Sequence, residues 1–424
     1  MHTLIEKIKL IVQDSSLRKK VLFVLGALVV FRLLATIPIP GVNQAQLVSL
    51  FENNQFLGLL NLFSGGGLSN LSIVMLGVGP YITASIVMQL MTLMIPRLKA
   101  MYHEEGEMGK KKFTQYSRLL TVPLAIIQGF GFMMLLQQQG VLSNLTAFDF
   151  FTNIVLVLGG SILLMWIGEL ITEFGIGNGV SLIIFAGIVA SLPQITQQLL
   201  FGFTPEQIPL FLGFGVLALV VISAVVIITE AERPIPITYA KRVRGNKVYG
   251  GVSTYLPLRV NQAGVIPIIF ALSILLFPQM IINLLGTIDN ALLQSISTFI
   301  TETILGTPWI YASFYFILVF LFTYFYTAVT FEPDSIATNL QKSGAFIPGV
   351  RPGKSTSDYI SKVLVRITLV GALFLGFIAV LPLIMQAVTN QAALAIGGTG
   401  LLIVVSVVLD LLKKIDAQVS MREY

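Results

Sequence analysis

The sequence LGLLNLFSGGGLSNLSIVM occupies residues 57–75, between the first two long apolar stretches of the chain. Its run of three consecutive glycines, Gly65–Gly67, and its Ser and Asn side chains make this segment too polar to cross a bilayer by itself. Irregular backbone at membrane depth persists only where protein or a water-filled cavity surrounds it. We therefore expect a short re-entrant helix inside a helical bundle, with an ordinary outer loop as the alternative.

Ten apolar segments of the length that a membrane-crossing helix needs surround this stretch. The composition agrees, since 55% of the residues are hydrophobic and only 11% are charged, whereas soluble proteins carry about a quarter charged residues. The chain is therefore predicted to be an all-α polytopic membrane protein. The segments are residues 21–39, 76–95, 119–137, 151–171, 177–195, 208–229, 263–285, 309–331, 364–386 and 393–412.

The Lys and Arg residues predict the topology, because all but one of the 26 lie in alternate gaps between these segments. Short loops rich in Lys and Arg stay on the cytoplasmic side, so both termini and three loops are predicted to be cytoplasmic. This bias, together with anionic lipid head groups, accounts for the net charge of +6. The exception is Arg32, which we expect to pair with a helix-end carbonyl or an acid. The basic clusters are Lys7–Lys20, Arg97–Arg118, Arg233–Arg259, Lys342–Arg366 and Lys413–Arg422.

Ten spans divide into two sets of five, and an odd number of spans makes the second set start from the opposite face. The two halves are therefore predicted to be inverted repeats, whose interface is the usual place for a pathway. Leu4, Ile5, Ile8 and Ile11 predict an amphipathic helix at the N-terminus. The expected parts are the cytoplasmic N-terminus 1–20, the first half 21–200, the second half 201–412 with cytoplasmic loops 230–262 and 332–362, and the tail 413–424.

Several classes of chemistry are excluded by residue content. The chain has no Cys, and its two histidines, His2 and His103, lie outside the predicted spans. An intramembrane Ser and His protease and a His metal site are therefore implausible. The sequence GVRPGKST at Gly349 spaces its glycines wrongly for a phosphate-binding loop. We expect no enzyme activity, no catalytic residue, no metal and no cofactor.

Two other classes of membrane protein remain as alternatives. An ion-coupled secondary transporter would also have inverted halves, but coupling usually needs an ionisable group facing the midplane pathway. Arg32 is the strongest residue in favour of that alternative. A structural membrane scaffold would have no need of the glycine-rich segment.

Four motifs follow one another along the chain and cover essentially all of it. They are LFSGGGLSNLSI with GVGPYITAS at 62–85, GIGNGVSLIIFAGIVASLP at 175–193, YAKRVRGNKVYGG with STYLPLRVNQAGVIPIIFA at 239–271, and NLQKSGAFIPGVRPGKST at 339–356. In this order and spacing they resemble the SecY family, the channel subunit of the Sec protein translocase. The resemblance implies a channel that passes unfolded secretory polypeptides across the bacterial cytoplasmic membrane. It also implies that transmembrane segments are released sideways into the lipid.

The resemblance also implies the residues of an hourglass-shaped pore, which has an aliphatic ring at mid-membrane, a plug helix and a lateral gate. A narrow aliphatic ring makes physical sense because it offers water no hydrogen bonds. The expected ring residues are Val78, Ile82, Val180, Ile184, Ile269 and Ile403. The plug is expected at about 60–71, including Leu60, Phe63, Ser64, Gly65, Gly66, Gly67 and Leu71. The gate residues are Thr83, Gln89, Gln128 and Phe277, for which routine helix packing is the alternative.

The loops 230–262 and 332–362 are implied to dock the ribosome, through its RNA phosphates, or the SecA motor ATPase. Further implied partners are the SecE and SecG subunits, signal sequences, nascent polypeptides and membrane lipids. Pro234 and Asn246 stand where many bacterial members of the family carry arginine. From the residues alone, the alternative is that these charges only orient the chain. The implied docking residues are Lys241, Arg242, Arg244, Lys247 and Arg351.

Overall fold

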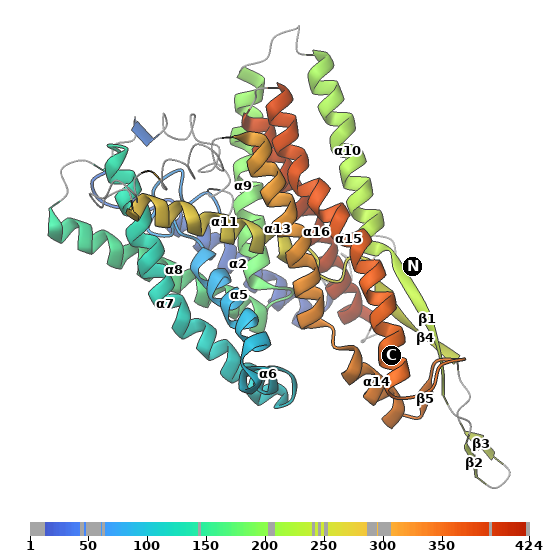
Figure 1. The fold of residues 1–424 in the computed structure, drawn as a ribbon. Helices are drawn as coiled ribbons and strands as arrows, with labels where there is room; N and C mark the ends of the chain where they lie inside the picture. The colour runs from blue at the N-terminus through green and yellow to red at the C-terminus, as the bar shows by residue number, and fades with distance from the viewer. Residues whose placement is uncertain are drawn as a thin grey trace. The chain divides into compact units, whose positions relative to one another are not determined.

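A computed structural model describes residues 13–42, 46–47, 61, 64–142, 146–201, 208–239, 242–244, 247–249, 253–285, 295, 307–389 and 392–420. This part of the chain is mostly helical, and each of the ten predicted segments coincides with a helix (Figure 1). The predicted N-terminal amphipathic helix falls largely on residues 1–12, outside the described part. The ten helices are α2 (Ser15–Leu34), α5 (Gly79–Met94), α7 (Gly106–Gln138), α8 (Ala147–Phe174), α9 (Gly179–Phe201), α10 (Ile208–Glu230), α11 (Ile266–Leu285), α13 (Pro308–Thr330), α15 (Lys354–Thr389) and α16 (Ala392–Ser420).

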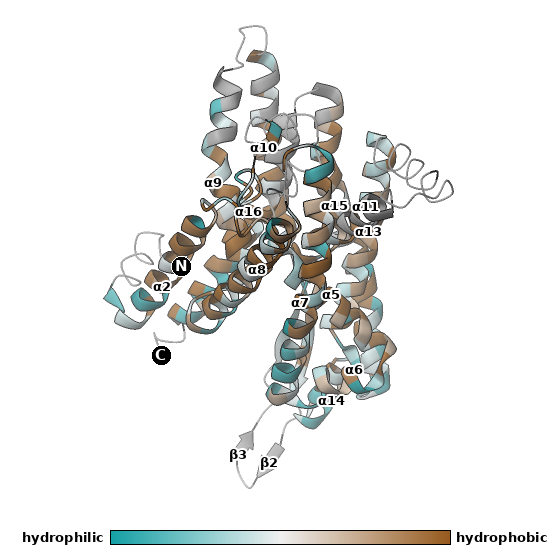
Figure 2. Cartoon of the chain, turned by 90° about the vertical axis from the view of Figure 1, so that its left-hand side faces the viewer, coloured by the Kyte–Doolittle hydropathy of each residue, from teal (hydrophilic) through white to brown (hydrophobic). Residues whose placement is uncertain are grey.

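Within the described residues, four stretches are both long and apolar enough to cross a membrane, namely Gly106–Gln138, Ala147–Phe174, Pro308–Lys342 and Lys354–Met385. A fifth results if α5 and the short helix α6 (Pro96–His103), which are bent by 115° at their junction, count as one span. Figure 2 shows hydrophobic residues along the helices and hydrophilic residues on α6 and on the short helix α14 (Pro333–Lys342). The protein is a largely helical membrane protein, and the count of ten crossings stays a prediction.

Local sequence explains where several helices begin. Asp14 caps α2, because its carboxylate accepts hydrogen bonds from the backbone N–H groups of Ser16 and Leu17. Thr146 and Asp149 form a reciprocal capping box at the start of α8. α7 and α15 begin well before their apolar segments, at Gly106 and Lys354. A helix can continue into water once its backbone hydrogen bonds are made, so apolar windows mark only its membrane part.

The chain separates into two compact units, of which the first contains residues 1–214, 272–311 and 382–424. In it, α7 packs on α5 and α8, and α9 packs on α8 and α16. Glycines allow two of these close approaches. A Cβ on Gly179 would collide with the carbonyl oxygen of Gly168 on α8, and a Cβ on Gly400 of α16 would lie 2.8 Å from Ile188 of α9. The main hydrophobic core of this unit includes Leu68, Leu71, Met75, Met133, Leu136 and Val157.

The second unit contains residues 215–271 and 312–381. Its sheet has the order β4-β1-β5, formed by β1 (Glu232–Tyr239), β4 (Ser253–Arg259) and β5 (Ala345–Phe346). Beyond β1 and β4 the same ribbon ends in the hairpin of β2 (Arg242–Arg244) and β3 (Lys247–Tyr249) (Figure 1). Ile235 and Ile237 alternate with exposed residues along β1, as expected of a strand with one buried face. Ile235 and Leu258 pack on Ile347 and on Ile360, Val363 and Ile367 of α15.

The expected plug helix does not continue over residues 64–71. Residues 64–71 form consecutive turns, although Asn61 just before them is helical. Gly65 and Gly66 have φ angles of 68° and 81°, which a right-handed helix cannot contain. Leu60 and Phe63 lie outside the described residues. Ser64, Leu68 and Leu71 are all buried, so this polar segment does lie in the protein interior as the membrane constraint requires.

The packing of α8 on this segment gives a stability prediction. A Cβ on Gly160 would collide with the carbonyl oxygen of Ile73, whereas a Cβ on Gly159 would meet nothing within 4 Å. Gly160→Ala should therefore lower the free energy of unfolding by about 1–3 kcal/mol, as overpacking does. Gly159→Ala is the matched control and should be neutral or slightly stabilising. Thermal unfolding in detergent measures both, and equal effects would contradict the packing described here.

Candidate functional site

The glycine-rich segment and its extension to Gly77 satisfy their polar backbone groups inside the first unit. Arg32 of α2 donates a hydrogen bond of 2.7 Å to the carbonyl oxygen of Gly65. The Ser72 hydroxyl donates to Gly67 at 2.9 Å, and Ser161 of α8 donates to Gly77 at 3.0 Å. The backbone N–H of Ile39 donates to Leu71, and that of Ile73 donates to Ile37. The segment is thus attached to α2, to α8, and to the residues on both sides of Pro38.

One residue at the end of this segment is strained. Leu71 has a φ angle of 41°, in the left-handed region that residues other than glycine seldom adopt. Its side chain is completely buried in the main core of the first unit. Such strain costs on the order of 1–3 kcal/mol and persists only where the surroundings impose it. Part of the stabilisation that the buried Leu71 side chain provides therefore offsets the cost of an unfavourable backbone conformation.

Of the residues predicted for the ring, Val78, Ile82, Val180, Ile184 and Ile403 belong to the first unit, and Ile269 belongs to the second. Val78 precedes α5 and Ile82 lies in its first turn, where both are buried. Ile184, Ile269 and Ile403 are buried as well. Val180 is only partly buried, and its Cγ2 lies toward α8, 3.4 Å from where a Cβ on Gly168 would be.

The contacts between α9 and α16 place two ring residues at one level. Ile188 of α9 meets Gly400 of α16, and Gly177 just before α9 meets Leu411, so the two helices run antiparallel. Ile184 lies about one helical turn before Ile188 on α9, and Ile403 lies about one turn after Gly400 on α16. Both residues are therefore on the side of the Ile188–Gly400 contact that faces the Gly177–Leu411 contact. Gly187, next to Ile188, contacts Gly65 of the glycine-rich segment. This segment therefore lies about one turn beyond the level of Ile184 and Ile403.

Two of the predicted gate residues meet. The Gln128 amide of α7 donates a hydrogen bond to the Thr83 hydroxyl of α5 at 3.4 Å. Gln89 instead donates to Ser85 on its own helix, and its buried Oε1 has no hydrogen-bond partner within the described residues. Phe277 lies on α11, and its side chain is outside the described ones. The Thr83–Gln128 bond thus joins two helices that are expected on the same side of the gate.

The predicted docking residues lie in the second unit. In the β2–β3 register, Arg242 faces Tyr249, Val243 faces Val248, and Arg244 faces Lys247. Since paired and alternate residues of a ribbon share a face, three basic positions and a tyrosine share one face of the hairpin. Like charges directly opposite each other are destabilising, so this face favours an anionic partner. Lys241 lies outside the described residues.

Arg351 lies in an exposed turn before α15. The turn is fixed from both sides, because the buried Thr356 hydroxyl donates to the Arg351 carbonyl at 2.9 Å and the Val350 N–H donates to Ile347 in the core of the second unit. Next to Thr356, Ser357 donates to Asp334 of α14 at 2.5 Å. An exposed cation is thereby held on a rigid support.

The sequence profile of the SecY family matches residues 72–412 of the chain. The chain belongs to the SecY family. It is 43% identical to the protein translocase subunit SecY of Mycobacterium leprae over 427 residues, which cover 96% of each chain. It is likewise 43% identical to the subunit of the same name from Pseudomonas aeruginosa, covering 97% of this chain and 92% of the relative.

Solved structures share the fold. A structure described as that of a protein-conducting channel covers 98% of this chain and 96% of its own, with a TM-score of 0.64 and 20% sequence identity. A structure of Sec61 in the canine ribosome-channel complex from the endoplasmic reticulum gives a TM-score of 0.61 and 18% identity over 98% of this chain and 96% of its own. At this level of identity the likeness concerns the fold.

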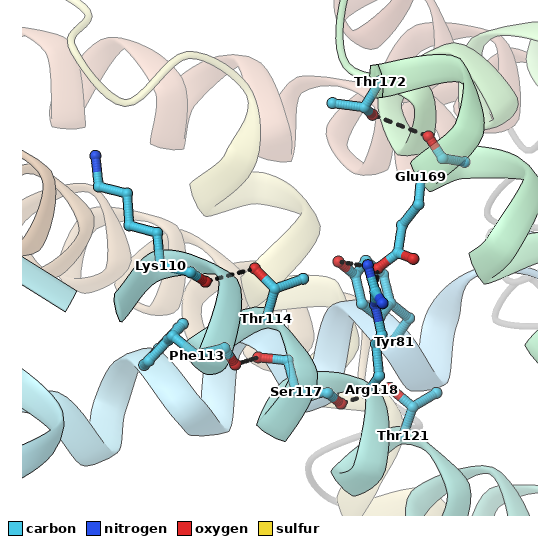
Figure 3. A network of polar contacts seen from close by, with 10 residues as sticks. Tyr81, Lys110, Phe113, Thr114, Ser117, Arg118, Thr121, Glu169 and Thr172 are labelled. Atoms are coloured by element: carbon cyan, nitrogen blue, oxygen red, sulfur yellow. Dashed lines mark hydrogen bonds and ion pairs between the residues drawn. The ribbon is translucent and has the colours of Figure 1, made fainter. Parts of the chain in front are cut away.

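The structure adds polar contacts that sequence reasoning missed. Arg118 of α7 forms an ion pair of 2.7 Å with Glu169 of α8, and the Tyr81 hydroxyl of α5 lies 3.5 Å from the same carboxylate oxygen (Figure 3). This cluster joins three helices near the end that is predicted to be cytoplasmic. Glu169 is an acid within a predicted span, and its partner Arg118 is 51 positions away in the chain. Spacing gives no signal for such a pair.

The Thr83–Gln128 bond gives a prediction about the strength of the helix contact. Replacing Thr83 by Val and Gln128 by Leu, singly and together, should give a coupling free energy of about 0.6 kcal/mol, the average for polar contacts between membrane helices. Unfolding by denaturant in detergent would measure the free energy of unfolding of the parent protein, the two single variants and the double variant. The control pair is Thr121→Val with Gln128→Leu, since Thr121 bonds only to Ser117 among the described residues. These two should be additive, and a coupling as large as that of Thr83 would contradict the assignment.

Proposed function

We propose that this protein is the channel subunit of the Sec translocase and that it conducts unfolded polypeptides past the glycine-rich segment. Membership of the SecY family carries the proposal, with relatives named as translocase subunits that match almost the whole chain. The protein is a channel and not an enzyme. It works in the cytoplasmic membrane, where bacterial members of the family reside.

The proposed seal has two layers. Residues 60–71 are the plug, and Val78, Ile82, Val180, Ile184, Ile269 and Ile403 form the aliphatic ring. One observation supports this arrangement: Gly187 holds Gly65 about one helical turn beyond the level of Ile184 and Ile403. By the predicted topology α9 runs outward, so the glycine-rich segment covers the ring from outside. A hydrophobic constriction excludes water and ions by dewetting while gripping no particular sequence.

The proposed lateral gate uses Thr83, Gln89, Gln128 and Phe277, and it admits signal sequences and releases transmembrane segments into lipid. The Thr83–Gln128 bond stabilises the α5–α7 side of the gate. The buried Oε1 of Gln89 offers an acceptor without a partner among the described residues. A seam with a few weak polar contacts can open without the unfolding of either side.

The proposed docking surface comprises the hairpin with Lys241, Arg242, Arg244 and Lys247, and the turn with Arg351. Its partners are the ribosome, through RNA phosphates, and the SecA motor ATPase. Crowded basic positions on a protruding ribbon support this assignment, because phosphates gain from counterion release on binding such a surface. The SecE and SecG subunits complete the proposed complex.

The proposed topology has ten spans in two inverted halves, 21–200 and 201–412, with both termini in the cytoplasm. The coincidence of each predicted span with a helix supports it. An ion-coupled transporter would need an ionisable group free to bind its ion. The best candidate for that role, Arg32, already donates to the carbonyl of Gly65, which favours a structural role for this charge.

The seal gives a prediction at Ile403. Replacing Ile403 by Asn places an amide at a buried position of the ring and gives water a hydrogen-bonding partner there. Weakening the closed state by about 1.4 kcal/mol raises the open fraction roughly tenfold. Export of precursors with defective signal sequences should increase accordingly, and planar-bilayer recordings should show a higher resting conductance.

The matched control is Val405→Asn on the same helix, where Val405 is only partly buried and lies on another face. It should leave export and conductance close to those of the parent protein. A larger effect at Val405 than at Ile403 would show that the ring is assigned to the wrong residues. Immunoblotting would show whether the Ile403→Asn and Val405→Asn variants are both lost from the membrane. In that case Ile403→Val, which is a milder change, is compared with the parent protein.

Docking gives a prediction at Arg351. Arg351→Glu should abolish translocation driven by the motor in membrane vesicles, because a carboxylate repels an anionic partner, while the resting conductance stays unchanged. Lys342→Glu is the control, since Lys342 is an exposed cation on the same loop at the end of α14. Equal losses for the two variants would point to net charge rather than to the Arg351 turn. A raised conductance in Arg351→Glu would contradict a pure docking role.

A further inference from the structure

Arg32 is the one cation that departs from the charge pattern of the sequence, and the structure gives it a specific acceptor. Its Nη1 lies 2.7 Å from the carbonyl oxygen of Gly65. A guanidinium within an apolar span is unfavourable unless it is paired. The acceptor here is no acid but the carbonyl of Gly65, whose left-handed φ angle and neighbouring bond from the Gly66 N–H to the Asn61 carbonyl are typical of the end of a helix. A hydrogen bond from a charged donor is stronger than one between neutral groups.

Gly65 is enclosed from two sides as well as bonded. A Cβ on Gly65 would collide with the tip of the Phe31 ring of α2, and a Cβ on Gly187 of α9 would collide with the Gly65 Cα. Phe31 is fully buried, and the Arg32 guanidinium carbon lies 6.0 Å from the centre of its ring. The φ angle of 68° at Gly65 also excludes most other residues. Gly65 thus contacts the Phe31 ring and the Arg32 guanidinium of α2 on one side, and the backbone of Gly187 of α9 on the other.

The other contacts that hold the segment differ in kind. Its far end is tied by backbone bonds, from Ile39 to Leu71 and from Ile73 to Ile37, and by the Asn70 amide, which donates to Ala35 at 3.4 Å. These contacts surround the turn after α2 and can persist while residues 64–67 move. Within the described residues, the Arg32 bond is the charged contact at the end of the segment that lies against α9.

We propose that Arg32 is a latch, whose hydrogen bond to the Gly65 carbonyl holds residues 64–67 against Gly187 and so keeps the plug in its closed position. The proposal rests on the proposed function, in which this segment is the plug. The segment is released when the Arg32–Gly65 hydrogen bond breaks and Gly65 separates from Gly187. No interlocking side chains oppose this separation, because the two glycines meet through backbone atoms. The latch accounts for a seal that is tight at rest and still easily opened.

The test measures the position of the segment separately from conduction. The chain has no Cys, so Leu68→Cys, at a buried position of the segment, is a unique target for a membrane-impermeant thiol reagent. Labelling is measured in membranes that contain the assembled translocase. Arg32→Gln, which removes the charge and shortens the side chain, should raise the labelling rate about tenfold or more, as expected for loss of a hydrogen bond to a charged group. Arg32→Lys, which keeps a charged donor, should restore most of the protection.

Two controls separate a latch from general damage. Gly26→Ala, on the same helix and with nothing within 4 Å of the added Cβ, should leave labelling unchanged. Leu164→Cys, buried on α8, should stay protected in Arg32→Gln if the unit remains folded. Gly187→Ala should raise the labelling of Leu68→Cys with Arg32 intact, because the added methyl displaces Gly65.

The results distinguish failure of the latch from failure of the plug. If Leu68→Cys labels at the parental rate in Arg32→Gln, the latch is overturned whatever the conductance does. If Leu68→Cys and Leu164→Cys become equally exposed, Arg32 stabilises the whole fold and the latch is overturned too. If Leu68→Cys alone becomes exposed and the resting conductance does not rise, the latch stands and the assignment of the segment as the plug is wrong.

Discussion

The membrane interior provides no water to satisfy backbone polar groups, and the structure of the glycine-rich segment depends on this constraint. A helix meets it with its own hydrogen bonds, but residues 64–78 form turns and need other partners. Side chains provide several of them. Arg32, Ser72 and Ser161 each donate to a carbonyl of the stretch from Gly65 to Gly77. The polar residues that make this segment look unsuited to a membrane are the ones that allow it to lie there.

The same contacts fit the latch proposed for this segment. Leucines and β-branched residues would interlock with α2 and α9, whereas Gly65 and Gly187 meet through backbone atoms alone. Such a contact excludes water by its closeness, yet little buried side-chain area is lost when it opens. The strained backbone of Leu71 lies at the other end of the segment, where the core holds it. The segment therefore combines one firmly packed end with one end held by a few polar and van der Waals contacts.

The sheet region of the second unit follows the rules of soluble proteins. Its sheet alternates buried and exposed residues, and Ile235, Leu258 and Ile360 form a compact core. This core holds the Arg351 turn in place, while β2 and β3 form a separate two-stranded hairpin. A packed core and exposed cations can lie side by side here, because water can solvate the charges. Within the spans, an unpaired cation would be unfavourable. In the proposed function, docking and conduction thus use separate parts of the chain.

The sequence alone determined the features that depend on local composition. Apolar length located all ten helices, the Lys and Arg pattern gave a topology, and four motifs gave the family. Local composition placed the end of the expected plug helix too far along the chain, because the left-handed conformations of Gly65 and Gly66 prevent a helix from continuing over residues 64–71. It also did not identify Gly65 as the acceptor for Arg32 or Arg118 as the partner of Glu169. Only the tertiary structure decided these contacts, since they join residues 33 and 51 positions apart, where no periodicity relates the partners.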